Sequence, residues 1–181
     1  MFRLTSVRVP ALTAAALFAA TAAVDIPHDQ PAQFATAADY VLEILFALAL
    51  GIAALACQAW AVRACEVGMR GARIAASTAA GGFACLSASA WSTAAVGHDA
   101  LGPVFLLGLL LMVGSAVALL VLDLRRRVVP RFAGVSFALA TVGMVALGDG
   151  YGVLAWTASW AAIAALASPA DQPAELARAT V

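Results

Sequence analysis

The sequence predicts an all-α membrane protein in which residues 1–181 form a single integral membrane domain, a bundle of six transmembrane helices with both termini in the cytoplasm. The first reason is composition, because 64% of the residues are hydrophobic and only 11% are charged, with a mean hydropathy of +0.97. A soluble core of this size cannot bury so much apolar surface. The second reason is a set of six apolar segments, and the third is a one-sided distribution of basic residues around them.

The six apolar segments are long enough, or nearly so, to cross the hydrocarbon core of a bilayer, which needs about 20 residues of helix. They cover about residues 9–26, 39–62, 74–96, 103–122, 130–147 and 151–168. The last two hold about 16 to 18 apolar residues each, so little tilt is available to them. If all six cross, the chain is a multi-pass protein.

The first segment also fits a second interpretation. Residues 11–24 follow two arginines and include the small residues Ala20, Thr21 and Ala22, a pattern that is typical of a secretory signal peptide as well. Cleavage at about residue 22 would leave five spans and place the new N-terminus outside.

The third and fourth segments suit different neighbours. The third is nearly all Ala, Gly, Ser, Thr and Cys, and small side chains let membrane helices approach one another closely. We therefore expect the third segment at the centre of the bundle. The fourth is dense in Leu and Val and suits contact with lipid over much of its circumference. Pro130 fits the first turn of the fifth helix, where a missing N–H costs nothing.

The positions of the arginines predict the orientation of the spans. All basic residues are arginines, and in a six-span arrangement they share one side of the membrane: Arg3, Arg8, Arg63, Arg70, Arg73, Arg125, Arg126, Arg127, Arg131 and Arg178. The opposite loops carry acidic residues and no base: Asp25, Asp29, Asp39, Asp99 and Asp149. Cytoplasmic loops retain arginine because its translocation is costly, so both termini are expected inside.

Glu43 is the most informative acidic residue, because it lies about one turn inside the outer boundary of the second span. Ionisable groups within spans are costly and usually face a cavity or a partner. Glu43 is therefore a candidate proton or ligand site, with His98, Asp99 and Asp149 as its expected companions. The alternative is a carboxylate that reaches out to the headgroup region.

Both histidines are expected on the outer side, in the dipeptides His28-Asp29 and His98-Asp99. Imidazoles and carboxylates suit zinc or another divalent cation, which makes His28 and His98 weak candidates for metal ligands. The sequence lacks the HxH, HExxH and cysteine-rich spacings that are typical of metal sites. We therefore expect solvated loop residues, with no metal and no cofactor.

Trp156 and Trp160 lie one turn apart on the sixth span, where they either fill the core or wall a pocket for a lipid tail or another hydrophobic ligand. Two stripes of small and polar residues on the second and third spans also allow two interpretations. Their side chains either line a water-filled path or form hydrogen bonds within and between helices, and the second interpretation is favoured. The stripes are Glu43, Ala47, Gly51, Ala54 and Gln58 on the second span, and Thr78, Gly82, Cys85, Ser89 and Ser92 on the third.

The loop before the fifth span has the sequence Arg125-Arg126-Arg127-Val128-Val129-Pro130-Arg131-Phe132-Ala133-Gly134. This stretch, flanked by apolar spans, resembles the inner loop of small, uncharacterised multi-pass membrane proteins of high-GC actinobacteria. The Ala-rich, lysine-free composition fits such a source. The resemblance implies a membrane location and brings no activity with it.

These features predict a non-enzymatic protein of the bacterial cytoplasmic membrane, either an accessory or interaction subunit or a binder of a lipid-like ligand. The expected partners are membrane lipids and a membrane protein or a second copy, and not nucleic acid, because the arginine clusters are too short for a basic domain. One alternative is a small transporter or channel coupled to protons or cations, using the outer acidic and histidine residues. Another is a membrane enzyme that acts on lipid at the outer face.

Overall fold

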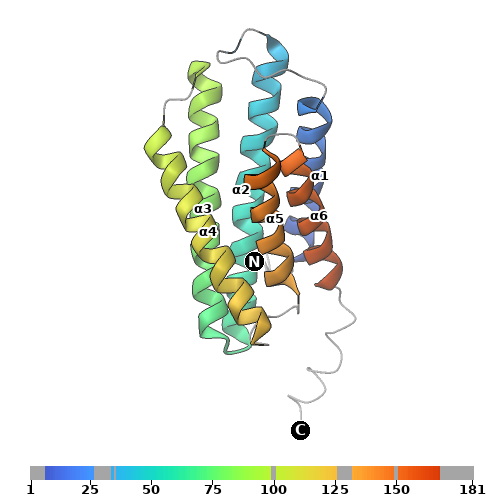
Figure 1. Ribbon diagram of the computed structural model, residues 1–181, viewed down its shortest axis with the longest axis vertical. Helices are drawn as coiled ribbons and strands as arrows, with labels where there is room; N and C mark the ends of the chain where they lie inside the picture. Colours follow the sequence, from blue (N-terminus) through green and yellow to red (C-terminus); the bar gives the residue numbers. More distant parts are fainter. Residues whose placement is uncertain are drawn as a thin grey trace, which may run out of the picture.

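The computed structural model describes residues 7–26, 34, 36–98, 101–125, 132–148 and 151–167. Within these ranges the chain is helical and contains no strand. The helices are α1 (Arg8–Asp25), α2 (Ala37–Glu66), α3 (Arg70–Val96), α4 (Gly102–Leu124), α5 (Ala133–Leu147) and α6 (Tyr151–Leu166). Each of the six predicted apolar segments is thus a helix, with bounds that differ from the prediction by a few residues (Figure 1).

The six helices form a ring. Each helix packs against its neighbours in sequence, and α1 packs against α6 to close the ring. Figure 1 shows the helices running roughly along the long axis of the molecule, with α3 and α4 on one side and α1, α5 and α6 on the other. Among the described helices, the backbone of α3 comes close only to those of α2 and α4, and α3 is one member of the ring, so the expectation that it lies at the centre is wrong.

The small residues of α3 nevertheless bring helices close together, as expected of them. A Cβ atom added to Gly82 would lie 3.0 Å from the carbonyl oxygen of Gly108 on α4, and one added to Gly108 would lie 3.0 Å from the carbonyl oxygen of Gly82. On the other side of α3, the Ser87 hydroxyl donates a hydrogen bond of 2.8 Å to the carbonyl oxygen of Ala47 on α2. Close backbone contact of this kind is the main source of packing energy between membrane helices.

Large aromatic side chains fill the middle of the ring. The ring of Phe137 lies 5.0 Å from that of Trp156 and 6.2 Å from that of Trp160, and Phe83 lies 5.1 Å from Trp156, measured between centroids. A ring of six helices leaves a central space that a helix of small residues cannot fill. Aromatic side chains from α1, α2, α3, α5 and α6 occupy it instead: Phe18, Trp60, Phe83, Phe137, Trp156 and Trp160.

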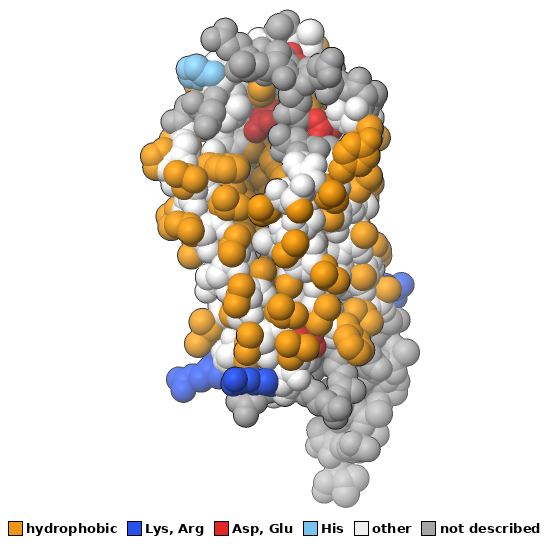
Figure 2. Space-filling model, viewed as in Figure 1, with side chains coloured by type: hydrophobic (Ala, Val, Ile, Leu, Met, Phe, Trp, Pro, Cys, Tyr) orange, Lys and Arg blue, Asp and Glu red, His pale blue; other side chains and the backbone are white. Residues whose placement is uncertain are grey.

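Three of the helices, α1, α2 and α4, are long and apolar enough to cross a membrane, and α5 and α6 are apolar but shorter. The outward surface of α4 is made of exposed Leu and Val side chains, with Leu110 exposed by 71%. Figure 2 shows hydrophobic side chains spread over the visible face between the two ends of the molecule. This distribution suits a protein surrounded by lipid.

The described charges separate along the bundle. Asp25 ends α1 and Asp39 begins α2 at one end, whereas Arg70 begins α3 and Arg125 follows α4 at the other. Figure 2 shows arginine side chains gathered near the lower end and acidic side chains near the upper end. Asp123 and Glu66 are acidic residues at the arginine end. Eight of the charges named above lie outside the described residues: Arg3, Asp29, Asp99, Arg126, Arg127, Arg131, Asp149 and Arg178.

The start of α5 differs from the prediction. The helix begins at Ala133, directly after Phe132, whose φ of 66° is in the left-handed region that interrupts a right-handed helix. Pro130 lies outside the described residues. The N–H groups of Phe132 and Val135 at the start of α5 donate to the carboxylate of Asp123 on the preceding helix, which no local motif in the loop indicates.

Candidate functional site

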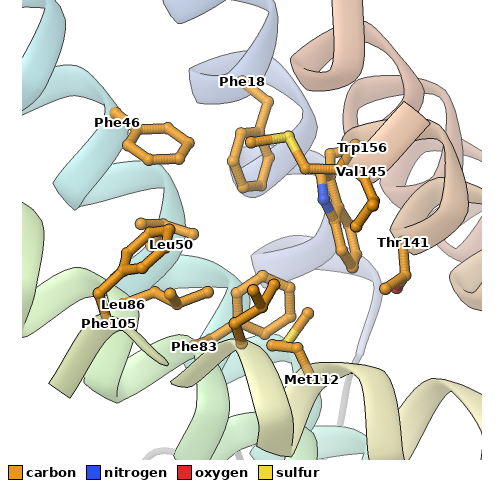
Figure 3. Close-up of a pocket in the computed structure, with 12 residues that line it drawn as sticks. Phe18, Phe46, Leu50, Phe83, Leu86, Phe105, Met112, Thr141, Val145 and Trp156 are labelled. Carbon is orange, nitrogen blue, oxygen red and sulfur yellow. The ribbon is translucent and has the colours of Figure 1, made fainter. Parts of the chain in front are cut away.

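All six helices contribute to one cavity of about 270 Å³ inside the ring. Figure 3 shows side chains from different helices pointing toward a shared open space. Its lining consists of Phe18, Phe46, Leu50, Phe83, Leu86, Phe105, Leu109, Met112, Thr141, Met144, Val145 and Trp156. An enclosed hollow of this size, lined from every helix, is the strongest candidate for a binding site in the described structure.

Helical spacing explains why these residues meet. Phe46 and Leu50 are four residues apart on α2, and Thr141 and Val145 are four apart on α5, so each pair lies on a single face of its helix. On α4 the spacings are four and three residues, which place Phe105, Leu109 and Met112 in successive turns. The faces of six helices therefore converge on one space.

The cavity opens between α4 and α5. Phe105 on α4 is 43% exposed and Val145 on α5 is 65% exposed, although both line the cavity. Figure 1 shows α4 leaning away from α5 toward the upper end, while the two helices come together at the lower end. Figure 2 shows a hollow on the same face, with hydrophobic side chains inside it. The opening thus faces sideways, within the apolar belt of the molecule.

The lining is almost entirely apolar. Trp156 forms one wall, with the ring of Phe18 stacked beside it at 6.3 Å and that of Phe83 edge-on at 5.1 Å. Met112 and Met144 add flexible thioether side chains that adapt to a ligand's shape. Thr141 is the polar side chain of the lining, and its hydroxyl donates to the carbonyl oxygen of Phe137 at 2.9 Å, leaving only acceptor capacity for a ligand.

The two tryptophans that the sequence singles out have different positions. Trp156 lines the cavity, whereas Trp160 lies behind it, fully buried, with its ring 6.3 Å from that of Trp156. The indole Nε1 of Trp160 has no hydrogen-bond partner in the described structure. Trp156 therefore both packs in the core and forms a wall of the cavity, whereas Trp160 packs in the core.

The predicted polar cluster is only partly described. Glu43 is half-buried on α2, one turn before Phe46, which places it at the acidic end of the cavity. His98 is exposed beyond the end of α3, while His28, Asp99 and Asp149 lie outside the described residues. Among the residues that are described, no group of three or more His, Cys, Asp or Glu side chains is placed to hold a metal ion.

Hydroxyl groups of the spans bond mainly to helix backbones. Thr78, from the stripe on α3, donates to the carbonyl oxygen of Ile74 in its own helix at 3.0 Å. Ser136 on α5 pairs with Ser159 on α6 at 3.2 Å, and Ser87 reaches α2 as described above. Of these hydroxyls only Thr78 belongs to a predicted stripe, and its bond within the helix is the kind that the packing interpretation expects.

Sequence reasoning missed the phenylalanines of the cavity. Phe18, Phe46, Phe83 and Phe105 each lie within an apolar segment, and no polar neighbour marks their face of the helix. The available signal is that four different spans each carry a phenylalanine, three of them well inside the apolar run and Phe105 near the start of its span. Comparisons with models of protein families, with curated proteins and with solved structures found no match for this chain.

Proposed function

We propose that the chain is a multi-pass protein of the bacterial cytoplasmic membrane, with both termini inside, that binds a single apolar chain or ring in the cavity of its helix ring. The observation that carries the proposal is the apolar cavity of about 270 Å³ with an opening between α4 and α5. An apolar cavity of about 150 Å³ is already enough to hold benzene, and ligand pockets usually begin at about 300 Å³. The space suits one hydrocarbon chain or ring and not a whole two-chain lipid.

The direction of the opening supports entry from the bilayer. An apolar ligand concentrates in the hydrocarbon region, and a sideways opening admits it without passage through water. Exposed side chains beside the opening are themselves apolar, including Leu106 and Val142. The ligand therefore remains in an apolar environment throughout its path.

The packing of α1 supports a ring of six helices over the five that would follow cleavage of a signal peptide. Phe18 is fully buried and lines the cavity, and Ala11 and Ala14 are fully buried as well. Removal of α1 would open the ring between α2 and α6 and take away one wall of the site. The cavity thus needs the first segment to stay with the protein.

The chemistry of the lining favours binding over catalysis or ion transport. None of the twelve lining side chains is a carboxylate, an imidazole, a thiol or an amine. Covalent and acid–base chemistry need such groups, and an ion that crosses a membrane needs oxygen ligands or water. Burial of apolar ligand surface against aromatic walls is what this space provides.

Quenching of tryptophan fluorescence tests the proposal, because Trp156 is in the cavity while Trp60 and Trp160 are fully buried. The exposed Trp91 is first changed to Phe, and purified protein in detergent is titrated with dibromostearate, whose bromine atoms quench tryptophan on contact. We expect saturable quenching in this background. Leu109→Phe, at a lining position, should weaken binding about tenfold by overfilling the space.

Leu110→Phe is the matched control, since Leu110 is the next residue on α4 and points outward, 71% exposed. This variant should bind dibromostearate as the parent does. If Leu109→Phe and Leu110→Phe bind dibromostearate equally well, or if quenching never saturates, the cavity is not the binding site.

A further inference from the structure

A second hollow lies at the arginine end of the molecule, on the outward face of α3. It is a shallow, open depression of about 410 Å³ lined by Arg70, Arg73, Ile74, Ser77 and Thr78. These positions are spaced by three and four residues, so they form one continuous face of the helix. None of them lines the central cavity, and the two spaces are separate sites.

The charge of this hollow is uncompensated within the described structure. Arg70 and Arg73 are exposed, no acidic residue lines the hollow, and neither arginine forms an ion pair with a described carboxylate. Arg73 makes only a weak contact of 3.5 Å with the sulfur of Cys65. Arg63, by contrast, is paired with Glu66 at 3.3 Å. The guanidinium groups of Arg70 and Arg73, beside the exposed hydroxyl of Ser77, present the donors that a phosphate group needs, whereas the Thr78 hydroxyl already donates to Ile74.

Beyond the hollow, the outward face of α3 carries a run of small side chains, which we expect to leave a shallow trough along the helix. Toward the acidic end, the outward face carries Gly81, Ala84 and Ala88 before the exposed Trp91 is reached. The stretch from Ser77 to Ala88 is roughly 16 Å long at the helical rise. The adjacent surface of α4 is built from larger side chains, such as Leu110 and Val117. Small side chains on α3 beside these larger ones on α4 leave room for an acyl chain on this face.

We propose that this face binds an anionic phospholipid, with the phosphate between Arg70 and Arg73 and one acyl chain in the trough toward Ala88. The proposal rests on the membrane placement proposed above. A bilayer core about 30 Å thick corresponds to about 20 residues of helix, which puts Arg70 and Arg73 at the inner headgroups when the far end of α3 is at the outer surface. Ile74 and the hydroxyl of Ser77 then lie at the boundary between headgroup and chain.

Charge complementarity favours a lipid over a second copy of the chain on this face. A symmetric dimer places the same surface of both copies together, at the same depth in the membrane. Arg70 and Arg73 would then oppose the same arginines of the partner, and like charges across an interface are destabilising. An anionic lipid supplies the missing negative charge and fills the trough.

The test compares phosphatidylglycerol with phosphatidylcholine by native mass spectrometry of the purified full-length protein, counting bound lipids after titration with each. A basic side chain near an anionic surface contributes about fivefold to affinity, so the parent should prefer phosphatidylglycerol by about tenfold or more. Arg70→Gln combined with Arg73→Gln should reduce this preference to less than about twofold. Arg125→Gln, an exposed arginine at the same end but outside the hollow, should keep it.

A preference that survives the double substitution, or that Arg125→Gln removes equally, would overturn the site on α3. If the Ala88→Cys variant forms a cross-linked dimer, and phosphatidylglycerol does not change the amount of dimer, then a second copy of the chain binds this face. That result would also overturn the proposal. The double variant should still bind dibromostearate in the cavity. If the double variant loses its lipid preference but still binds dibromostearate, the change is confined to the site on α3. If the protein stays soluble without detergent, the proposed membrane placement itself is overturned.

Discussion

The carboxylate of Asp123 on α4 accepts a hydrogen bond of 3.1 Å from the backbone N–H of Val135 in the first turn of α5. It accepts a second, also of 3.1 Å, from the N–H of Phe132. The residue at the N-cap position of α5 provides no side-chain cap of its own, so Asp123 does this from the preceding helix. A negative charge is also favourable at this end of a helix. The pair joins α4 and α5 below the opening of the central cavity.

Replacement of Asp123 with Ala should destabilise the protein by about 2 kcal/mol, because two part-buried N–H groups lose their carboxylate acceptor. The measurement is thermal unfolding in detergent. Glu66→Ala is the control, since Glu66 belongs to an exposed pair whose removal costs at most about 1 kcal/mol. A melting temperature that falls equally in the two variants would mean that Asp123 does not hold α5.

Gly134→Ala should cost about 1 to 3 kcal/mol through overpacking. A Cβ atom at Gly134 would collide with the carbonyl oxygen of Leu119 on α4, which is backbone and does not move aside easily. Gly114→Ala is the matched control, because a Cβ there would meet nothing within 4 Å. Alanine is a better helix former than glycine, so this second change should be neutral or slightly stabilising. The reverse order of melting temperatures would contradict the close crossing of α4 and α5.

The contact between α3 and α4 can be tested with two adjacent glycines. A Cβ on Gly82 would lie 2.9 Å from Met112 Cγ and 3.0 Å from the Gly108 carbonyl oxygen, whereas one on Gly81 would lie 4.0 Å from Leu111 Cδ1. Gly82→Ala should therefore lower stability by about 1 to 3 kcal/mol, and Gly81→Ala should not. Thermal unfolding of the two variants in the same detergent measures the difference. Equal stability would show that α3 does not approach α4 closely.

The helices could be predicted because the sequence alternates between long apolar segments and short polar ones, and this signal is local. Their arrangement could not. Gly82 and Gly108 indicate that a close approach occurs but not which helices make it, so α3 was wrongly expected at the centre of the bundle. In a protein surrounded by lipid, residues that face inward and outward are both apolar, so the usual amphipathic pattern is missing.

The cavity could not be predicted either, because the residues that line it and the residues on the outer surface are both apolar. Phe46 lines it and Leu48, two residues away, is 40% exposed on the outside, yet both are large apolar residues in one uniform run. Trp160 could be suspected because it lies too deep for an interfacial tryptophan, but Trp156, one turn earlier, is the one that lines the cavity. The contact of Asp123 with Val135 depends on a turn between two helices and has no signature in the sequence.

The orientation of the protein makes a last prediction that uses a native cysteine. Cys65 is exposed near the arginine end of α2, whereas Cys57 is fully buried. If arginines stay in the cytoplasm, an impermeant thiol reagent added to intact cells should not reach Cys65, and labelling should appear only after lysis.

His98→Cys places a second thiol at the other end of the bundle, where His98 is exposed after α3. This variant should be labelled in intact cells, and a Cys65→Ser change should leave that labelling unaltered while removing the signal gained on lysis. Labelling of Cys65 from outside, with His98→Cys protected, would invert the topology. Arg70 and Arg73 of α3 would then face the outer leaflet, and the phosphate-binding role proposed for them would have to be tested with the lipids of that leaflet.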